Sequence, residues 1–221
     1  MRKAACDKVR KRLLALARKT DGSPLAKARL QDVTFADARI SSDGGPGPLI
    51  RDVMHRAGVE TIDERATTKP SKKLEDYALY THSAIFAEVK VDEDLGTVAV
   101  TRVVSAVAGG RVLNPKTARN QIVGSVVWGV GMALEEESVM DHALGRFMTH
   151  NLADYHVPVH ADVHDIDVIF VDEPDDVINP LGVKGLGEIG LVGVAAAIAN
   201  AVYHATGKRV RDLPITLDKL L

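Results

Sequence analysis

NPLGVKGLGEIGLVGVAAAIANAVYHATGKRVRDLPIT, residues 179–216, joins a glycine-rich loop to an alanine-rich helix and a short β-like tail. Glycines at 182, 185, 187, 190 and 193 let the backbone reach positive φ and approach another group closely. Apolar residues in 194–206 recur at helical spacing, and Gly207 stands where a helix ends in the left-handed conformation. Glu188 lies in the loop before the expected helix N-terminus, where unpaired N–H groups attract anions. The stretch therefore predicts a ligand site around Glu188.

Two other interpretations of the loop stay open. Residues 185–190, GLGEIG, fit the G-x-G-x-x-G dinucleotide fingerprint, and Asp212 follows at about the expected distance. That fingerprint needs a strand running directly into the first glycine, but EPDDVINPLGVK separates Gly185 from the last expected strand, 166–171. We therefore expect no NAD or ATP binding. The third interpretation is a glycine turn that serves only tight packing.

The string GVKGLGEIGLVGVAAAIANAVYHATGKRVRDLPIT closely resembles the C-terminal end of the molybdopterin-binding subunit of the xanthine dehydrogenase and aldehyde oxidase family. The resemblance extends back through FAEVKVDEDLGTVAV, GRVLNPKTARNQIVGSVVWGVGMALEEES and DIDVIFVDE, and covers the chain from about residue 80 onward. EEES, ADYHVPVHADVHDIDVIF and the final helix are most similar to the bacterial aldehyde-oxidising members. The resemblance implies the C-terminal portion of a much longer subunit, either half of a naturally split subunit or the product of a truncated gene.

Family members hydroxylate aldehydes or heteroaromatic rings at a molybdenum held by molybdopterin, with water as the oxygen source. By resemblance Glu188 is the catalytic glutamate, a general base, and Lys184, Gly185, Gly187 and Gln121 contact the cofactor, with no direct metal ligand from the chain. Electrons would leave through iron–sulfur and flavin (FAD) groups in partner chains. The family's other cofactor-binding segments lie upstream, so we expect an incomplete site and little or no molybdenum in the isolated chain. A non-catalytic assembly fragment is the alternative.

The composition is that of an ordinary soluble protein. The 221 residues are 46% apolar and 26% charged with a net charge of −2, which gives no electrostatic reason to expect nucleic acid or a membrane surface. Cys6 is the only cysteine, so the chain alone holds no disulfide and no iron–sulfur cluster. The basic N-terminal stretch lacks a signal peptide's apolar core, and the compartment, cytoplasm or periplasm through a partner's export signal, stays open.

The expected fold class is α/β (α+β), with mixed sheets, β-hairpins and packed helices. Residues 1–75 form a partial N-terminal subdomain and 76–221 the catalytic-glutamate domain, with a linker or surface loop over 61–79. The first part is predicted to contain helices over 3–19, from Pro24 and over 48–58, and one strand over 33–41. The second part is predicted to contain a hairpin over 84–92 and 97–108, a helix from an Asn114 cap to about Glu137, and a strand over 167–173.

The helix that follows Asn114 carries three internal glycines, at 124, 129 and 131. Each costs about 0.5–1 kcal/mol relative to alanine, so a neighbouring helix or a cofactor is expected to approach this helix closely. Gln121 and Trp128 are its distinctive side chains, although many family members carry glutamine at the position of Trp128. We expect an exposed apolar face here and on the 182–193 loop, where the rest of the subunit would dock.

Residues 150–167 hold four histidines among four aspartates, which raises the question of a metal site: His150, His156, His160 and His164. Pro158 disfavours the continuous helix that would align the last three of them. Loop-bonding or solvent-facing roles are therefore favoured. Asp154 and Asp167 in this stretch are the rivals of Glu188 as a catalytic base.

Overall fold

The computed structural model describes residues 2–20, 22–42, 45–69 and 72–220. The chain divides into two compact units, Met1–Lys72 (unit 1) and Lys73–Leu221 (unit 2), each with a hydrophobic core of its own. The division lies three residues before the domain boundary expected from the sequence. The candidate site residues all belong to unit 2, so unit 1 is described first and briefly.

Unit 1 packs a helix on a small hairpin. Its elements are α1 (Arg2–Arg18), the 3₁₀ helix η1 (Leu30–Asp32), β1 (Val33–Ala36), β2 (Arg39–Ser42) and α2 (Ile50–Arg56). Leu14, Leu25 and Ile40 are fully buried at the centre of its core. Gly58 at φ 65° ends the second helix region as expected.

Two predictions for unit 1 are wrong. The expected single strand over 33–41 is a hairpin, because Asp37 and Ala38 take φ of 49° and 57° and reverse the chain between β1 and β2. Positive φ is uncommon for alanine, so no ordinary turn signal marks this position in the sequence. The helix expected from Pro24 is a series of turns, in which the Ser23 hydroxyl accepts a hydrogen bond from the Leu25 amide.

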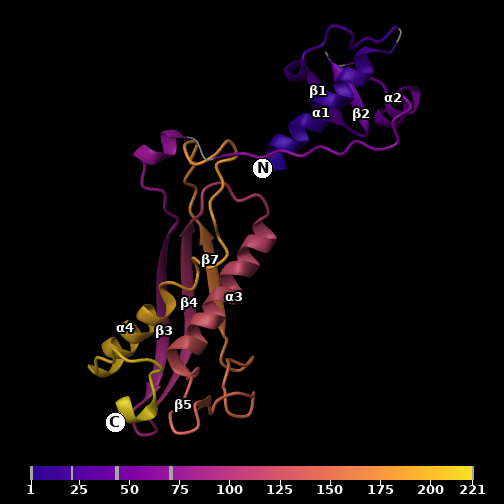
Figure 1. Ribbon diagram of the computed structural model, residues 1–221. Coiled ribbons are helices and arrows are strands. Elements are labelled where there is room, and N and C mark those ends of the chain that lie inside the picture. The colour runs from indigo at the N-terminus through magenta and orange to yellow at the C-terminus, as the bar shows by residue number, and fades with distance from the viewer. Residues whose placement is uncertain (1, 21, 43–44, 70–71, 221) are drawn as a thin grey trace. The chain divides into compact units, whose positions relative to one another are not determined.

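Unit 2 is a three-stranded mixed sheet with two helices on one face (Figure 1). The sheet order is β3 (His82–Asp92), β4 (Thr97–Ala108), β7 (Asp165–Phe170), with β3 antiparallel and β7 parallel to β4. The helices are α3 (Pro115–Leu134) and α4 (Val194–Thr206). One buried cluster joins these elements: it contains Val103 from β4, Val126 from α3 and Ile198 from α4. The predicted mixed α/β class is confirmed.

The ends of both helices follow from local chemistry. The Thr117 amide donates to the Asn114 side chain at 3.2 Å, which confirms the predicted N-cap of α3. That helix ends at Leu134, before the expected Glu137, because the amides of Glu135 and Glu136 both turn back to the Gly131 carbonyl oxygen. Gly207 at φ 72° ends α4 as predicted.

The tail after α4 is not β-like as expected. It forms bends and the 3₁₀ helix η3 (Leu217–Lys219), and Ile215 is buried in the core of unit 2. A single bond from the Ile215 amide to the Ala133 carbonyl oxygen (2.7 Å) ties the tail to the end of α3. The apolar tail residues are thus used for packing against a helix end and not for a strand ladder.

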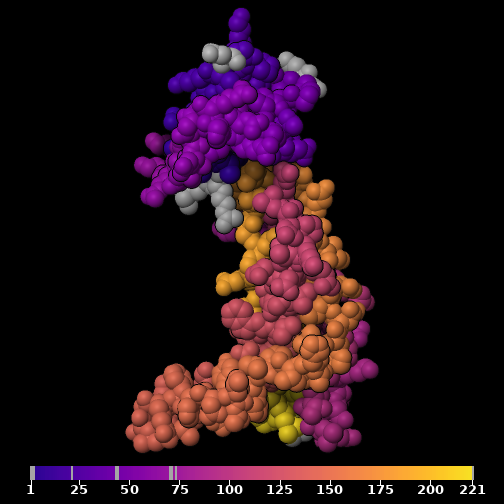
Figure 2. Space-filling view, turned by 90° about the vertical axis from the view of Figure 1, so that its right-hand side faces the viewer, coloured from indigo at the N-terminus to yellow at the C-terminus, as the bar shows by residue number. Residues whose placement is uncertain are grey.

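The remaining elements of unit 2 are short. The 3₁₀ helix η2 (Lys72–Asp76) precedes the sheet, and β5 (Met140–Asp141) pairs with β6 (Arg146–Phe147) in a hairpin. The segment of this hairpin projects from the body of unit 2 (Figure 2). Leu144, Phe147 and Leu152 are exposed there. In the described part of the chain, no helix has the length and apolar character to cross a membrane.

Candidate active site

Four of the five predicted catalytic and cofactor-binding residues line one cavity of about 720 Å³ in unit 2. One wall comes from α3 and the other from the glycine loop that precedes α4. The lining residues are Asn120, Gln121, Gly124, Ser125 and Trp128 from the helix and Gly185, Gly187 and Glu188 from the loop. The fold therefore brings together Gln121 and Glu188, which are far apart in sequence.

The helical wall is one face of α3. Residues 121, 124, 125 and 128 follow the i, i+3, i+4, i+7 spacing of a single helix face. A Cβ added to Gly124 would meet no atom within 4 Å, so this glycine leaves open space at the cavity. Trp128 is 51% exposed. This face of α3 thus combines one open backbone position with amide and aromatic side chains.

The other two glycines of α3 serve packing. A Cβ at Gly129 would lie 2.4 Å from the Val194 Cβ, and one at Gly131 would lie 2.2 Å from Glu136 Oε1 and 2.7 Å from the Pro158 Cδ. Gly129 therefore lets α4 approach α3, and Gly131 lets the 150–164 segment approach it. The neighbouring-helix explanation is confirmed at Gly129, whereas the approach of a cofactor at Gly124 stays a prediction.

The glycines of the loop divide in the same way. Gly185 faces open space, and the nearest atom to a Cβ at Gly187 is Gln121 Oε1 at 4.0 Å. Gly190 packs on α3, since its Cβ would lie 3.0 Å from Ser125 Cβ. The loop is therefore open to the cavity at Gly185 and Gly187 and in tight contact with α3 at Gly190.

Glu188 is exposed at the cavity, and its carboxylate has no hydrogen bond or ion pair to the described residues. Its carbonyl oxygen accepts from the Leu191 amide at 3.0 Å, which closes a turn. Helix α4 begins only at Val194, so Glu188 lies six residues before the helix and outside its first turn. Its carboxylate is left available to a ligand.

The two rival carboxylates are already engaged. Asp154 accepts from the Asn151 amide group at 2.6 Å. Asp167 forms an ion pair with Arg102 on the exposed side of the sheet, and this hydrogen bond raises the Arg102 pKa. Neither residue lines the cavity. Among the three candidate bases, only Glu188 faces it.

Lys184 is adjacent to the cavity in sequence but turns away from it. Its ammonium lies 3.1 Å from Asp175 Oδ2, and its side chain is 6% exposed. The pKa of Asp175 is lowered mainly by the hydrogen bond from the Ile178 amide and then by Lys184. In this arrangement Lys184 anchors the start of the glycine loop. Its contact with a cofactor stays a prediction that would require the ion pair to open.

Three hydroxyls that the sequence analysis did not single out bind the glycine loop. Thr81 donates to the Gly185 carbonyl oxygen at 3.1 Å and Ser83 to that of Ile189 at 3.3 Å. The Ser125 hydroxyl lies 3.2 Å from the Gly187 carbonyl oxygen and 2.8 Å from that of Gln121. The sequence carried one signal for them, the position of Ser125 one turn after Gln121 on the same helix face.

The G-x-G-x-x-G fingerprint of dinucleotide-binding proteins requires a strand directly before the loop and a helix directly after it. Val183 makes only an isolated bridge to Gly110, and α4 begins nine residues after Gly185. No strand of the described chain leads into Gly185. The local geometry therefore differs from that of the fingerprint.

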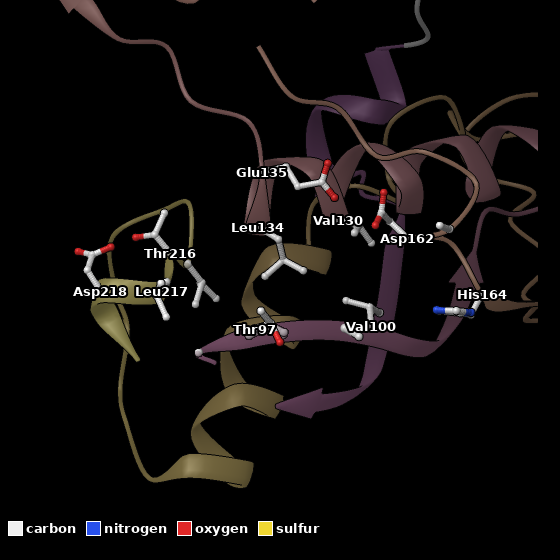
Figure 3. A pocket seen from close by; sticks show the side chains of 15 residues that line it. Thr97, Val100, Val130, Leu134, Glu135, Asp162, His164, Thr216, Leu217 and Asp218 are labelled. Carbon is white, nitrogen blue, oxygen red and sulfur yellow. The ribbon is translucent and has the colours of Figure 1, made fainter. Parts of the chain in front are cut away.

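A second cavity of about 640 Å³ lies at the other end of β3, where the hairpin turns into Thr97 (Figure 3). Glu135 and Asp162 line it, and the Glu135 pKa is raised mainly by burial and then by the negative charge of Asp162.

The metal site considered for the histidine-rich stretch is not formed by the described residues. Within the described ranges, no three His, Cys, Asp or Glu side chains come close enough to hold a metal ion. His150 Nδ1 lies 2.7 Å from the Met148 carbonyl oxygen.

Comparison with known families identifies the class of this chain. Residues 2–164 match the molybdopterin cofactor-binding domain family. The match spans most of the chain, so the chain belongs to this family, as the sequence resemblance implied.

Individual relatives include a subunit that binds molybdenum and a subunit of a dehydrogenase complex. The molybdenum-binding subunit PaoC of an aldehyde oxidoreductase from Escherichia coli K12 is 47% identical over 191 residues, 85% of this chain and 25% of PaoC. A subunit of the 6-hydroxypseudooxynicotine dehydrogenase complex of Paenarthrobacter nicotinovorans is 34% identical over 143 residues. The 143 aligned residues are 64% of this chain and 18% of that subunit. The chain thus spans about a quarter or less of the length of these relatives.

A solved structure has the same fold. Quinoline 2-oxidoreductase from Pseudomonas putida 86 superposes with a TM-score of 0.81 at 25% identity, over 98% of this chain and 28% of that chain. The fold of this chain is therefore that of a molybdopterin-binding domain.

Proposed function

We propose that this chain forms one wall of a molybdenum cofactor site and supplies Glu188 as the general base of an oxidoreductase acting on an aldehyde. The observation that carries the proposal is an unpaired carboxylate at a cavity whose other walls are open glycine backbone and an amide side chain. Family membership supports molybdopterin as the ligand, and the 47% identity with PaoC favours an aldehyde over a heteroaromatic ring.

The residues at the cavity fit a pterin cofactor, which is flat and has hydrogen-bonding edges. Gly124 and Gly185 leave room at the backbone, because a side chain at either position would extend into open space. The Gln121 amide has no hydrogen-bond partner among the described residues, so both its donor and its acceptor are available. Gln121, Gly185 and Gly187 would hold the cofactor from this side, with Lys184 as the further predicted contact.

Glu188 would act on a proton. Oxidation of an aldehyde by water yields a carboxylic acid, two protons and two electrons. The cofactor, when bound, supplies the two-electron oxidation. Glu188 removes a proton from the oxygen that water contributes, as that oxygen attacks the aldehyde carbon. A carboxylate within hydrogen-bond reach of this oxygen is typically worth roughly 10²–10⁴-fold in rate.

We take α3 and the glycine loop together as one side of the complete cofactor site, so the proposed activity is a property of an assembly. We infer that the rest of a molybdenum-binding subunit supplies the opposite wall, and that chains carrying iron–sulfur and flavin groups accept the electrons. The exposed Trp128, Met132 and Val192 lie beside the cavity and on the loop, where such a contact is expected. The isolated chain is expected to hold little or no molybdenum.

Replacement of Glu188 by glutamine in the assembled enzyme tests the proposal. The variant keeps size and most hydrogen bonding but removes the base, so kcat is expected to fall by roughly 10²–10⁴-fold with molybdenum content unchanged. Asp154→Asn is the matched control and is expected to leave turnover intact. Near-normal turnover of Glu188→Gln would show that Glu188 is not the base, and loss of molybdenum in step with activity would make it a cofactor-retention residue.

A further inference from the structure

The carbonyl groups on both sides of Glu188 are bound by side-chain hydroxyls. Gly187 precedes Glu188 and Ile189 follows it, and their carbonyl oxygens lie 3.2 Å from the Ser125 hydroxyl and 3.3 Å from the Ser83 hydroxyl. Thr81 holds the carbonyl oxygen of Gly185 at 3.1 Å. Hydroxyls therefore bind alternate carbonyl groups along the loop, at 185, 187 and 189.

The three hydroxyls come from two different elements. Thr81 and Ser83 lie immediately before and within β3, and Ser125 lies in α3. The loop is thus attached to the edge strand of the sheet and to the helix that forms the other cavity wall. Ser125 has a single hydroxyl proton, which serves either the Gln121 or the Gly187 carbonyl oxygen at one time. Within the described part of the chain, Thr81 and Ser83 each have one acceptor.

These bonds matter because the loop has little structure of its own. Residues 184–190 belong to no helix or strand, and the glycines among them have the largest backbone freedom of any residue. Backbone entropy opposes the ordering of such a segment, and each hydrogen bond from a side-chain hydroxyl opposes its opening. The three hydroxyls therefore help to keep Glu188 at the cavity.

We propose that Thr81, Ser83 and Ser125 are positioning residues that hold the Glu188 backbone in place for proton transfer. The inference rests on the proposed function, since it takes Glu188 to be the base. The displacement of a reacting group by about 1 Å can cost on the order of 10²-fold in rate, so loss of these bonds lowers kcat. The side chains themselves do not line the cavity, except for Ser125.

Tryptic cleavage after Lys184 measures the loop directly, without cofactor or activity. The Lys184 side chain is 6% exposed and paired with Asp175, so trypsin reaches it only when the loop opens. When opening and closing are fast, the cleavage rate follows the open population. Removal of one hydroxyl in Thr81→Val or Ser83→Ala is expected to raise cleavage after Lys184 by about 3- to 10-fold. Cleavage after the exposed Arg146 in β6 is the internal reference.

Two variants are matched controls. Thr81→Ser keeps the hydroxyl and is expected to leave the loop closed. Thr101→Val removes a hydroxyl that bonds Glu88 across the same sheet, away from the loop, and is expected to leave cleavage after Lys184 unchanged. A loop that stays equally closed in the Thr81→Val/Ser83→Ala double variant would overturn the inference.

The catalytic test uses the same double variant in the assembled enzyme. We expect kcat to fall about 10-fold while KM and molybdenum content stay near their original values. The Thr81→Ser variant, in which Ser83 is unchanged, is expected to keep full activity. An open loop with normal kcat, in an enzyme that Glu188→Gln inactivates, would refute the positioning role alone. Normal kcat in the double variant and in Glu188→Gln would instead remove the premise that Glu188 is the base.

Discussion

Asp175 and Glu188 lie in the same connection between β7 and α4 but in opposite chemical situations. Asp175 accepts hydrogen bonds from two backbone amides and pairs with the Lys184 ammonium. The Glu188 carboxylate has no such partner among the residues that the structure describes. A carboxylate fully engaged by its own chain is a structural anchor, whereas one left open at a cavity is available for chemistry.

The Asp175 anchor has a predicted pH dependence. Its pKa is lowered in the folded chain, so its stabilisation is fully present above the unfolded value of about 3.9 and is lost as pH falls through the lower folded pKa. Asp175→Asn is therefore expected to lower the melting temperature at pH 7, with a difference from the original chain that shrinks as pH falls from about 5 toward 3. Calorimetry over this range measures it, and a gap that widens toward low pH would contradict the assignment.

At this scale the sequence singled out residues that line one cavity, but not the groups that hold them there. Glu188, Gln121 and the open glycines follow from a local motif and a resemblance. The partner of Lys184 and the hydroxyls of Thr81 and Ser83 do not, because the two hydroxyls lie 104 and 106 residues from the carbonyls they bind. Such contacts depend on how β3 and the loop meet in the fold, and no local pattern encodes them.

Helix α3 shows the same division within one element. Its glycines stand on different faces, Gly124 toward the cavity and Gly129 toward α4. An alanine methyl at the first position enters open space, and at the second it collides with Val194. The two substitutions are chemically identical and are expected to act in opposite directions.

Gly129→Ala is expected to destabilise unit 2 by about 1–3 kcal/mol through overpacking. Gly124→Ala is its matched control and is expected to stabilise the helix by about 0.5–1 kcal/mol, because alanine is the better helix former. In the assembled enzyme Gly124→Ala is expected to lower molybdenum content, since its methyl group would lie in the cavity proposed to hold the cofactor. Urea titration and metal analysis measure the two effects; equal destabilisation by both variants would be the contrary result.

Elements with strong periodicity and a clear cap were predictable. The β3–β4 hairpin, α3 and α4 were each expected within a few residues of their observed bounds. The β1–β2 hairpin was not, because its turn uses Asp37 and Ala38 in place of glycine. The C-terminal tail was misassigned because its apolar residues bury against a helix end, and burial alone does not distinguish a strand from an irregular segment.

At the scale of the whole molecule, the chain contains two cores that share no residue among those described. One is built around Leu14, Leu25 and Ile40, and the other around Val103, Val126 and Ile198. The division falls at Lys72, within the segment expected from the sequence to be a linker or surface loop. The candidate site lies wholly in the second unit.

Residues 73–221 are therefore expected to fold without residues 1–72. The shorter chain should keep the melting temperature of unit 2 and the slow cleavage after Lys184, because the residues that hold the loop are all retained. Differential scanning calorimetry of both chains is the measurement. A shorter chain with no cooperative transition would show that the second core depends on the first unit.

Trp128 gives the candidate site an optical reporter. It is the only tryptophan of the chain, and its indole lies in the cavity wall beside Gln121 and Gly124. All tryptophan emission of the isolated chain therefore comes from this wall, without background from either core. Its spectrum and quenching by iodide report the local polarity and access to solvent, so a change in the cavity can be followed by fluorescence in the unlabelled protein.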